Sequence, residues 1–175
     1  MNDRIDIQRP PSPVVAYATT NDNILSQDIE QLSHYFEHSC HIPSRVAQQY
    51  TRTIFEKYPF LATREAMLSS RRELKAALLD VGMSRGHILM VAVNLFEGET
   101  QEMCAYFKSC GIHSREAMEY AADLYMEGLV VSERQVMELE DNGELKVLLG
   151  RICMVEMDVK ALYGKIYETK KREWE

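Results

Sequence analysis

Apolar residues recur through most of the chain at the spacing of a helix. Leu25, Ile29, Leu32 and Phe36 follow one another by four, three and four residues, which places them on one helical face. The same three- and four-residue spacing continues in later segments, and glycine or proline separates them. The pattern predicts an all-α fold, a multi-helix bundle forming a single helical domain over residues 22–175.

Small polar residues mark where these helices begin. We expect Ser44 to cap a helix reaching about residue 58 and Thr63 to cap one ending near residue 81, with Gly82 in the left-handed position that follows. Ser84 opens the segment containing the apolar run 88–93, which fits a buried helix or a buried strand, and we favour the helix. Ser132 begins a capping-box pattern.

The first part of the chain differs in character. Residues 1–21 contain three prolines and little apolar periodicity. We predict an extended or disordered arm there, with a short strand at 14–17, that a partner can order.

The last part of the chain carries a heptad pattern. Its apolar positions alternate three and four residues apart, which predicts one long helix over 144–171 with a coiled-coil seam. Either the domain's own helices or a protein partner, including a second copy, can cover this seam. The candidate interface residues are Leu145, Leu148, Ile152, Val155, Val159, Leu162 and Ile166.

Two segments of the chain resemble each other. When residues 35–50 are set against residues 106–120 with Glu37 omitted, nine of fifteen positions are identical, where about one is expected by chance. The match continues at Glu73-Leu74-Lys75, which faces Glu144-Leu145-Lys146. We interpret this as a duplicated helix-turn-helix-like unit at about 23–79 and 94–149; shared helix-capping chemistry is the alternative.

The unit has the form of a helix-turn-helix, with Gly111 where the turn requires a positive φ. In that motif the exposed residues of the second helix meet DNA. In the first copy these include guanine-, adenine- and phosphate-binding types, so the candidate DNA-binding residues are Ser44, Arg45, Gln48, Gln49, Arg52 and Thr53. Both copies can equally be plain helical hairpins inside a bundle.

The second copy is acidic where the first is basic. Glu116, Glu119, Asp123 and Glu127 occupy the exposed positions of its second helix, and phosphates would repel them. This face is better suited to a protein partner than to DNA.

Charge and composition limit the possible partners. The formal net charge is −7, so any contact with duplex DNA must be local. No apolar run approaches the length of a membrane span, and the N-terminus lacks the apolar segment of a secretory signal. The four cysteines are too sparse for a disulfide scaffold, so we expect a reducing cytoplasm and no membrane partner.

Candidate catalytic or metal-binding chemistry is scarce. His34, His38, Cys40 and His41 form one dense group of possible zinc ligands, but the two helical histidines lie opposite the apolar face and Cys40 aligns with Cys110 in a packing position. No phosphate-binding glycine loop, dinucleotide fingerprint or metalloprotease motif is present. We therefore expect no metal, no cofactor and no enzymatic activity.

Two functions fit these observations. The first is a non-enzymatic DNA-binding transcriptional regulator that uses the helix beginning at Ser44 and assembles through the C-terminal helix. The second is an all-helical adaptor or scaffold subunit of a larger assembly, which binds protein through its acidic second copy and methionine-rich surfaces.

Overall fold

The structure is a computed structural model that describes residues 27–174, and every regular element in this range is helical, which confirms the all-α prediction. The predicted arm and its strand at 14–17 lie outside the described residues. After a helix at 27–34 come η1 (Tyr35–Ser39), α2 (Ser44–Lys57), η2 (Pro59–Leu61), α3 (Arg64–Ser69), α4 (Arg71–Asp80), α5 (Arg85–Leu95), α6 (Glu97–Ser109), α7 (Ser114–Gly128), α8 (Glu133–Asp141), α9 (Leu145–Arg151) and α10 (Glu156–Trp174).

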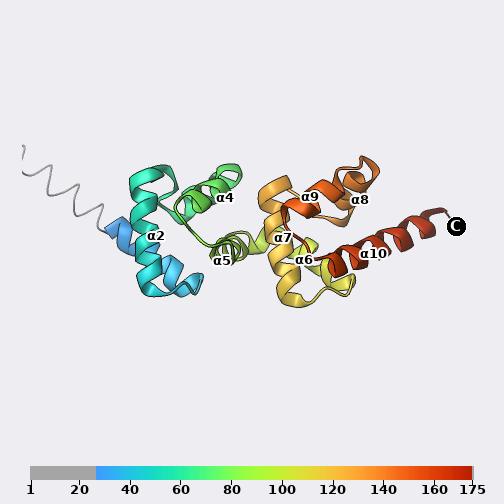
Figure 1. The fold of residues 1–175 in the computed structure, drawn as a ribbon, viewed down its shortest axis with the longest axis horizontal. Helices are drawn as coiled ribbons and strands as arrows, with labels where there is room; N and C mark the ends of the chain where they lie inside the picture. The colour runs from blue at the N-terminus through green and yellow to red at the C-terminus, as the bar shows by residue number, and fades with distance from the viewer. Residues whose placement is uncertain (1–26, 175) are drawn as a thin grey trace, which may run out of the picture.

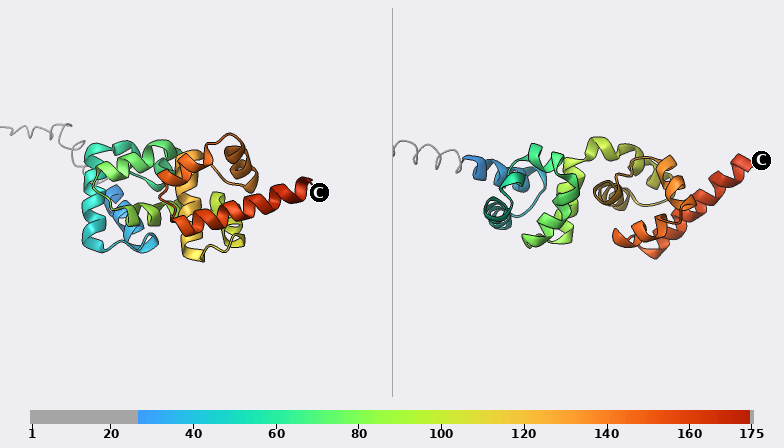
Figure 2. Two further views of the ribbon diagram at one scale, coloured as in Figure 1. Left: turned by 45° about the vertical axis from the view of Figure 1, so that its right-hand side comes forward. Right: turned by 90° about the horizontal axis from the view of Figure 1, so that it is seen from above.

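The helices form an elongated row rather than a sphere (Figure 1). Elements up to α5 enclose one hydrophobic core, and elements from α6 enclose a second. Helix α7 belongs to both, because Ala122 and Met126 pack in the first core while Ala121 and Leu124 pack in the second. Helix α10 extends away from the row, as the two further views also show (Figure 2).

Similar turns connect several of the helices. Gly82, Gly111 and Cys153 have φ values of 80°, 88° and 51°, and the N–H of the residue after each donates to a carbonyl five residues back. This is the hydrogen bond of a Schellman motif, in which the following apolar side chain packs under the helix end. Met83, Ile112 and Met154 are buried in this way. The predicted roles of Gly82 and Gly111 are therefore confirmed.

Most of the predicted helix caps are present. The hydroxyls of Thr63, Ser84 and Ser132 accept hydrogen bonds from backbone N–H groups three residues ahead, at 3.1, 3.3 and 3.4 Å. The prediction for Ser44 is wrong: Ser44 is the first residue inside α2, and its hydroxyl donates to Glu37 Oε2 at 2.8 Å instead. Pro43 occupies the N-cap position, so Ser44 lies one residue too far into the helix to cap it.

Two predicted helices are each divided in two. The helix expected over 63–81 breaks at Ser70, between α3 and α4. The single heptad helix expected over 144–171 is wrong, since the chain turns between α9 and α10. Cys153 adopts a positive φ there, and Ile152 and Met154 enter the second core on either side of it. Apolar spacing continues across the turn, and two short helices on one core satisfy it as well as one long helix does.

Two tyrosines from the aligned segments make matching contacts. The Tyr50 hydroxyl accepts from the Ser84 amide at 3.4 Å, where α5 begins, and hydrogen bonds with His87 Nδ1 at 3.2 Å. The Tyr120 hydroxyl accepts from the Val155 amide at 3.3 Å, where α10 begins, and donates to Asp158 at 2.9 Å. Each tyrosine therefore holds the start of a later helix.

Candidate functional site

The predicted DNA-binding residues share the outer face of α2, at one end of the row (Figure 1). Ser44, Arg45, Gln48, Gln49 and Arg52 are exposed, and Thr53 is half-buried with its hydroxyl donating to the Gln49 carbonyl at 3.0 Å. Arg45 and Arg52 make no ion pair among the described residues. The face thus presents two guanidinium groups, two helical turns apart, to solvent.

The aligned face of α7 is used differently. Arg115, at the position of Arg45, pairs with Glu119 at 3.1 Å on the same helix. Further along, Ala122 and Asp123 are buried at the positions of Arg52 and Thr53. The acidic residues predicted for a protein partner therefore partly serve contacts inside this chain.

An ionic cluster joins α7 to the first half of the molecule. Lys75 Nζ of α4 lies 2.7 Å from Asp123 Oδ1 and 2.6 Å from Glu127 Oε1. Arg85 of α5 lies 3.5 Å from Asp123 Oδ2 and also donates to the Ile152 carbonyl. Arg71 donates to the carbonyls of α7 at Tyr125 and Met126, so the cluster also satisfies the end of that helix.

Burial changes the titration of this cluster. The Asp123 carboxyl is 1% exposed, and this burial is the main cause of its raised pKa. The neighbouring charges of Lys75 and Arg85 act to lower the same pKa. Burial also opposes the charged form of Lys75, but hydrogen bonds to Asp123 and Glu127 outweigh it and raise the pKa of the ammonium. The cluster holds together two halves of the molecule, and Asp123 Oδ2 is buried in it without a hydrogen-bond partner among the described residues.

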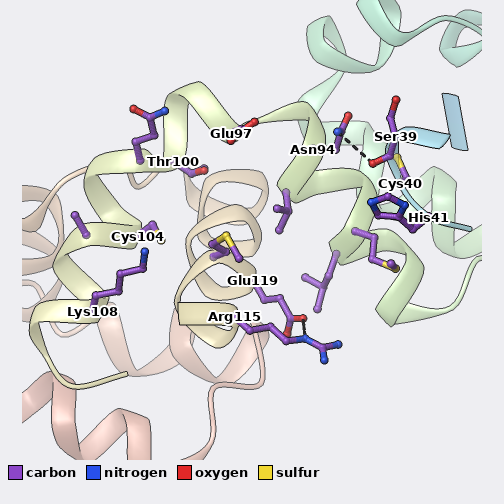
Figure 3. Close-up of a pocket in the computed structure, with 16 residues that line it drawn as sticks. Ser39, Cys40, His41, Asn94, Glu97, Thr100, Cys104, Lys108, Arg115 and Glu119 are labelled. Atoms are coloured by element: carbon purple, nitrogen blue, oxygen red, sulfur yellow. Dashed lines mark hydrogen bonds and ion pairs between the residues drawn. The ribbon is translucent and has the colours of Figure 1, made fainter. Parts of the chain in front are cut away.

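A groove of about 750 Å³ lies between α5 and α6. Phe96 is buried where α5 and α6 meet, and its ring centroid lies 5.0 Å from the ring centroid of Tyr125. This packing holds α5 and α6 at their angle to each other. Figure 3 shows α6 on one side, α5 with the turn at Ser39 to His41 on the other, and Arg115 and Glu119 of α7 below. The apolar lining is Leu89, Met90, Val93, Cys104, Ala105 and Met118.

The charges at the two ends of the groove differ. Glu97 stands at the first turn of α6, and Lys108 near its last turn, where no described residue pairs with its ammonium. Asn94 bridges the groove wall by donating to the Ser39 carbonyl at 3.3 Å. Met90 and Met118 are both exposed inside the groove. The groove thus combines apolar and polar side chains, with Glu97 toward one end and with Lys108 and the Arg115–Glu119 ion pair toward the other.

The candidate zinc ligands do not converge. His34 and His38 are exposed, with ring centroids 4.1 Å apart, while Cys40 is buried and His41 is exposed on a positive-φ turn. Burial raises the pKa of the Cys40 thiol to about 11. Among the described residues, no three His, Cys, Asp or Glu side chains are grouped to hold a metal ion.

The heptad residues lie mainly inside the second core. Leu145, Leu148, Ile152, Leu162 and Ile166 are buried, Val159 is half-buried against the same core, and Val155 is exposed. The chain's own helices therefore cover most of the seam, which was one of the two alternatives.

Searches of known protein families, curated proteins and solved structures gave no match to this chain. The described helices also include none long and apolar enough to cross a bilayer. Function must therefore be inferred from the surfaces themselves.

Sequence reasoning missed the groove and the ionic cluster. Met90 of α5 and Met118 of α7 are 28 positions apart and meet only because the two helices pack together. Lys75 and Asp123 are 48 positions apart, on α4 and α7, so no local pattern predicts their ion pair. The one available signal was the apolar character of α5 on all sides, since a helix apolar all round must contact more than one neighbour.

Proposed function

We propose that this chain is a non-enzymatic helical adaptor that binds an amphipathic helix of a partner protein in the groove between α5 and α6. The observation that carries the proposal is the exposure of Met90 and Met118 in a groove that Leu89, Val93, Cys104 and Ala105 also line. Apolar grooves of this kind accept helices through side chains at i, i+3, i+4 and i+7, and methionine adapts to varied partners.

The charges of the groove set the expected orientation of the partner helix. Lys108 favours an acidic residue at the end of the helix beside it, and Glu97 favours a basic residue at the other end. The bound helix would contact Met118 at the floor of the groove and Val93 on the α5 side.

A displayed library of amphipathic helical peptides, selected on the purified chain, tests this proposal. Peptides selected on the native chain should bind Met118→Glu at least tenfold more weakly and Met157→Glu unchanged. Met157 is an exposed methionine on α10, outside the groove. The proposal is overturned if no peptide is enriched, or if both variants bind equally well.

DNA binding through the outer face of α2 is the second candidate, and the unpaired Arg45 and Arg52 favour it. In a transcriptional regulator these guanidinium groups would meet phosphates or guanine edges, with Gln48 and Gln49 between them. The test is binding of labelled random duplex DNA over a salt series. The expected result is affinity that falls steeply with salt and is lost in Arg45→Ala/Gln48→Ala. Absence of binding at low salt would leave the adaptor function.

We also propose that the two aligned segments are copies of one unit. The matching turns at His41 and Gly111, both with positive φ, and the matching contacts of Tyr50 and Tyr120 support this.

We also propose a cytoplasmic location for this chain, because free cysteines such as the exposed Cys153 are suited to a reducing compartment.

A further inference from the structure

The outer face of α10 is centred on Gly164. Leu162 and Ile166, two positions before and after it, are buried in the second core. Successive residues of a helix are about 100° apart, so Gly164 lies nearly opposite both of them. Gly164 is exposed, and an added Cβ there would meet no atom within 4 Å. This face is thus open, on a helix that extends away from the row (Figures 1 and 2).

Charged residues are placed symmetrically about Gly164. Lys160 lies four positions before it and Glu168 four positions after it. Glu156 lies eight positions before it and Arg172 eight positions after it. All four of these residues are exposed. Each charge before Gly164 is therefore matched by an opposite charge at the same distance after it.

The same face also carries apolar surface. Met157 is 76% exposed and Tyr167 is 71% exposed, although both are large apolar side chains. Met157 lies seven positions before Gly164, and Tyr167 lies three positions after it. At these intervals both residues are on the Gly164 side of the helix. A neighbouring helix on this face would gain by burying them.

We propose that the outer face of α10 is the contact surface of a homodimer, in which the α10 helices of two copies pack antiparallel and meet at Gly164. A two-fold axis there places each residue before Gly164 at the level of the residue the same number of positions after it in the other copy. Lys160 then lies at the level of Glu168 of the second copy, and each such pair forms twice.

An ion pair within α10 takes part in this contact. Lys160 lies 2.7 Å from Glu156, with side chains 75% and 82% exposed. Exposed pairs of this kind contribute little by themselves, whereas several charges in a network contribute more. In the dimer, this pair and Glu168 and Arg172 of the second copy form a network of four charges of alternating sign.

The symmetry of the charges favours a second copy over a different partner. A surface that binds its own copy across a two-fold axis must be complementary to itself, and a different partner imposes no such condition on this chain. A parallel pair would instead place Lys160 beside Lys160 and Glu168 beside Glu168, which like charges disfavour. Gly164 allows the two backbones to approach closely where they meet.

This contact differs from the predicted seam, which includes Leu162 and Ile166 on the opposite, buried side of α10. It is also separate from the groove between α5 and α6, so either proposal can fail while the other stands.

Two charge reversals test the antiparallel arrangement. Lys160→Glu and Glu168→Lys each put like charges at both levels of the dimer. Each variant alone should therefore dimerise at least tenfold more weakly than the native chain, measured by sedimentation equilibrium over a concentration series. An equimolar mixture of the two variants has opposite charges at both levels of a heterodimer, and it should recover dimerisation.

A matched pair of glycine variants tests where the helices meet. Gly164→Arg should weaken the dimer at least tenfold, because two large cations would meet at the two-fold axis. Gly150→Arg should leave it unchanged, since Gly150 is exposed on α9 and an added Cβ there also meets no atom within 4 Å. Circular dichroism checks that both variants keep their helices.

Three results would overturn the proposal. A native chain that stays monomeric at every concentration would leave the face to a different partner. Equal dimerisation of the two glycine variants would place the contact elsewhere. A mixture of the charge variants that does not recover dimerisation would exclude the antiparallel arrangement.

Discussion

Lys75 Nζ of α4 lies 2.7 Å from Asp123 Oδ1 of α7, and this ion pair joins the two halves of the molecule. Asp123 is buried, and its second oxygen has only Arg85 near it, at 3.5 Å. A buried carboxylate depends strongly on its partners, because losing one leaves a charge without solvation.

Removing the Lys75 ammonium should therefore be costly. We expect Lys75→Ala to lower the free energy of unfolding by about 3 kcal/mol, measured by urea denaturation. Lys57→Ala is the matched control, since Lys57 pairs with Asp80 at 3.1 Å with both side chains about half exposed. Lys57→Ala should lower the free energy of unfolding by less than about 1 kcal/mol. Equal losses would show that the cluster does not join the two halves.

The same pair should give a characteristic pH dependence. The folded-state pKa of Lys75 is raised above its ordinary value of 10.5, so its stabilising contribution is complete below that value and is lost as the pH rises through the folded pKa. The stability difference between the native chain and Lys75→Met should narrow as the pH is raised above 10.5. Urea unfolding of both proteins from pH 8 upward measures this, and a constant difference would contradict it.

Thiol reactivity should separate two of the cysteines. Burial raises the pKa of Cys40 to about 11, so only about one thiol in a thousand is ionised at pH 8. Cys153 is exposed. Iodoacetamide at pH 8, followed by mass spectrometry of peptides, should label Cys153 at least tenfold faster than Cys40. Comparable rates would mean that the turn at Cys40 opens readily.

The turn before α7 should require glycine. Gly111 has a φ of 88°, a backbone conformation that is strained for any residue with a side chain, even though an added Cβ would meet no neighbouring atom. Gly111→Ala should cost about 1–2 kcal/mol of stability. Gly86→Ala, within α5 and equally free of contacts, should instead be neutral or stabilise by up to about 1 kcal/mol. Thermal or urea unfolding compares the two; the same sign for both would refute the argument.

Much of the local structure follows from the sequence. Thr63, Ser84 and Ser132 cap helices, and Gly82 and Gly111 end them, because these residues act on backbone groups within a few positions of themselves. The outer face of α2 was also predicted correctly as a surface, since its polar residues alternate with buried Ala47, Tyr50 and Ile54.

Other features depend on contacts between distant residues. Ser44 donates to Glu37 rather than capping α2, and the heptad segment turns at Cys153 because Ile152 and Met154 both gain burial in the second core. A periodic pattern of apolar residues indicates which side chains are buried, but one long helix and two shorter helices produce the same pattern. The groove between α5 and α6 likewise depends on Phe96 packing beside Tyr125.

The sequence by itself determined the helical class, most helix ends and the exposed polar stripe of α2, because each depends on residues within one or two turns of one another. Tertiary structure alone decided that Lys75 meets Asp123, that the C-terminal helices cover most of their own seam, and that a groove lies between α5 and α6. Those outcomes depend on how whole helices pack, which is set by the summed burial of side chains far apart in the chain.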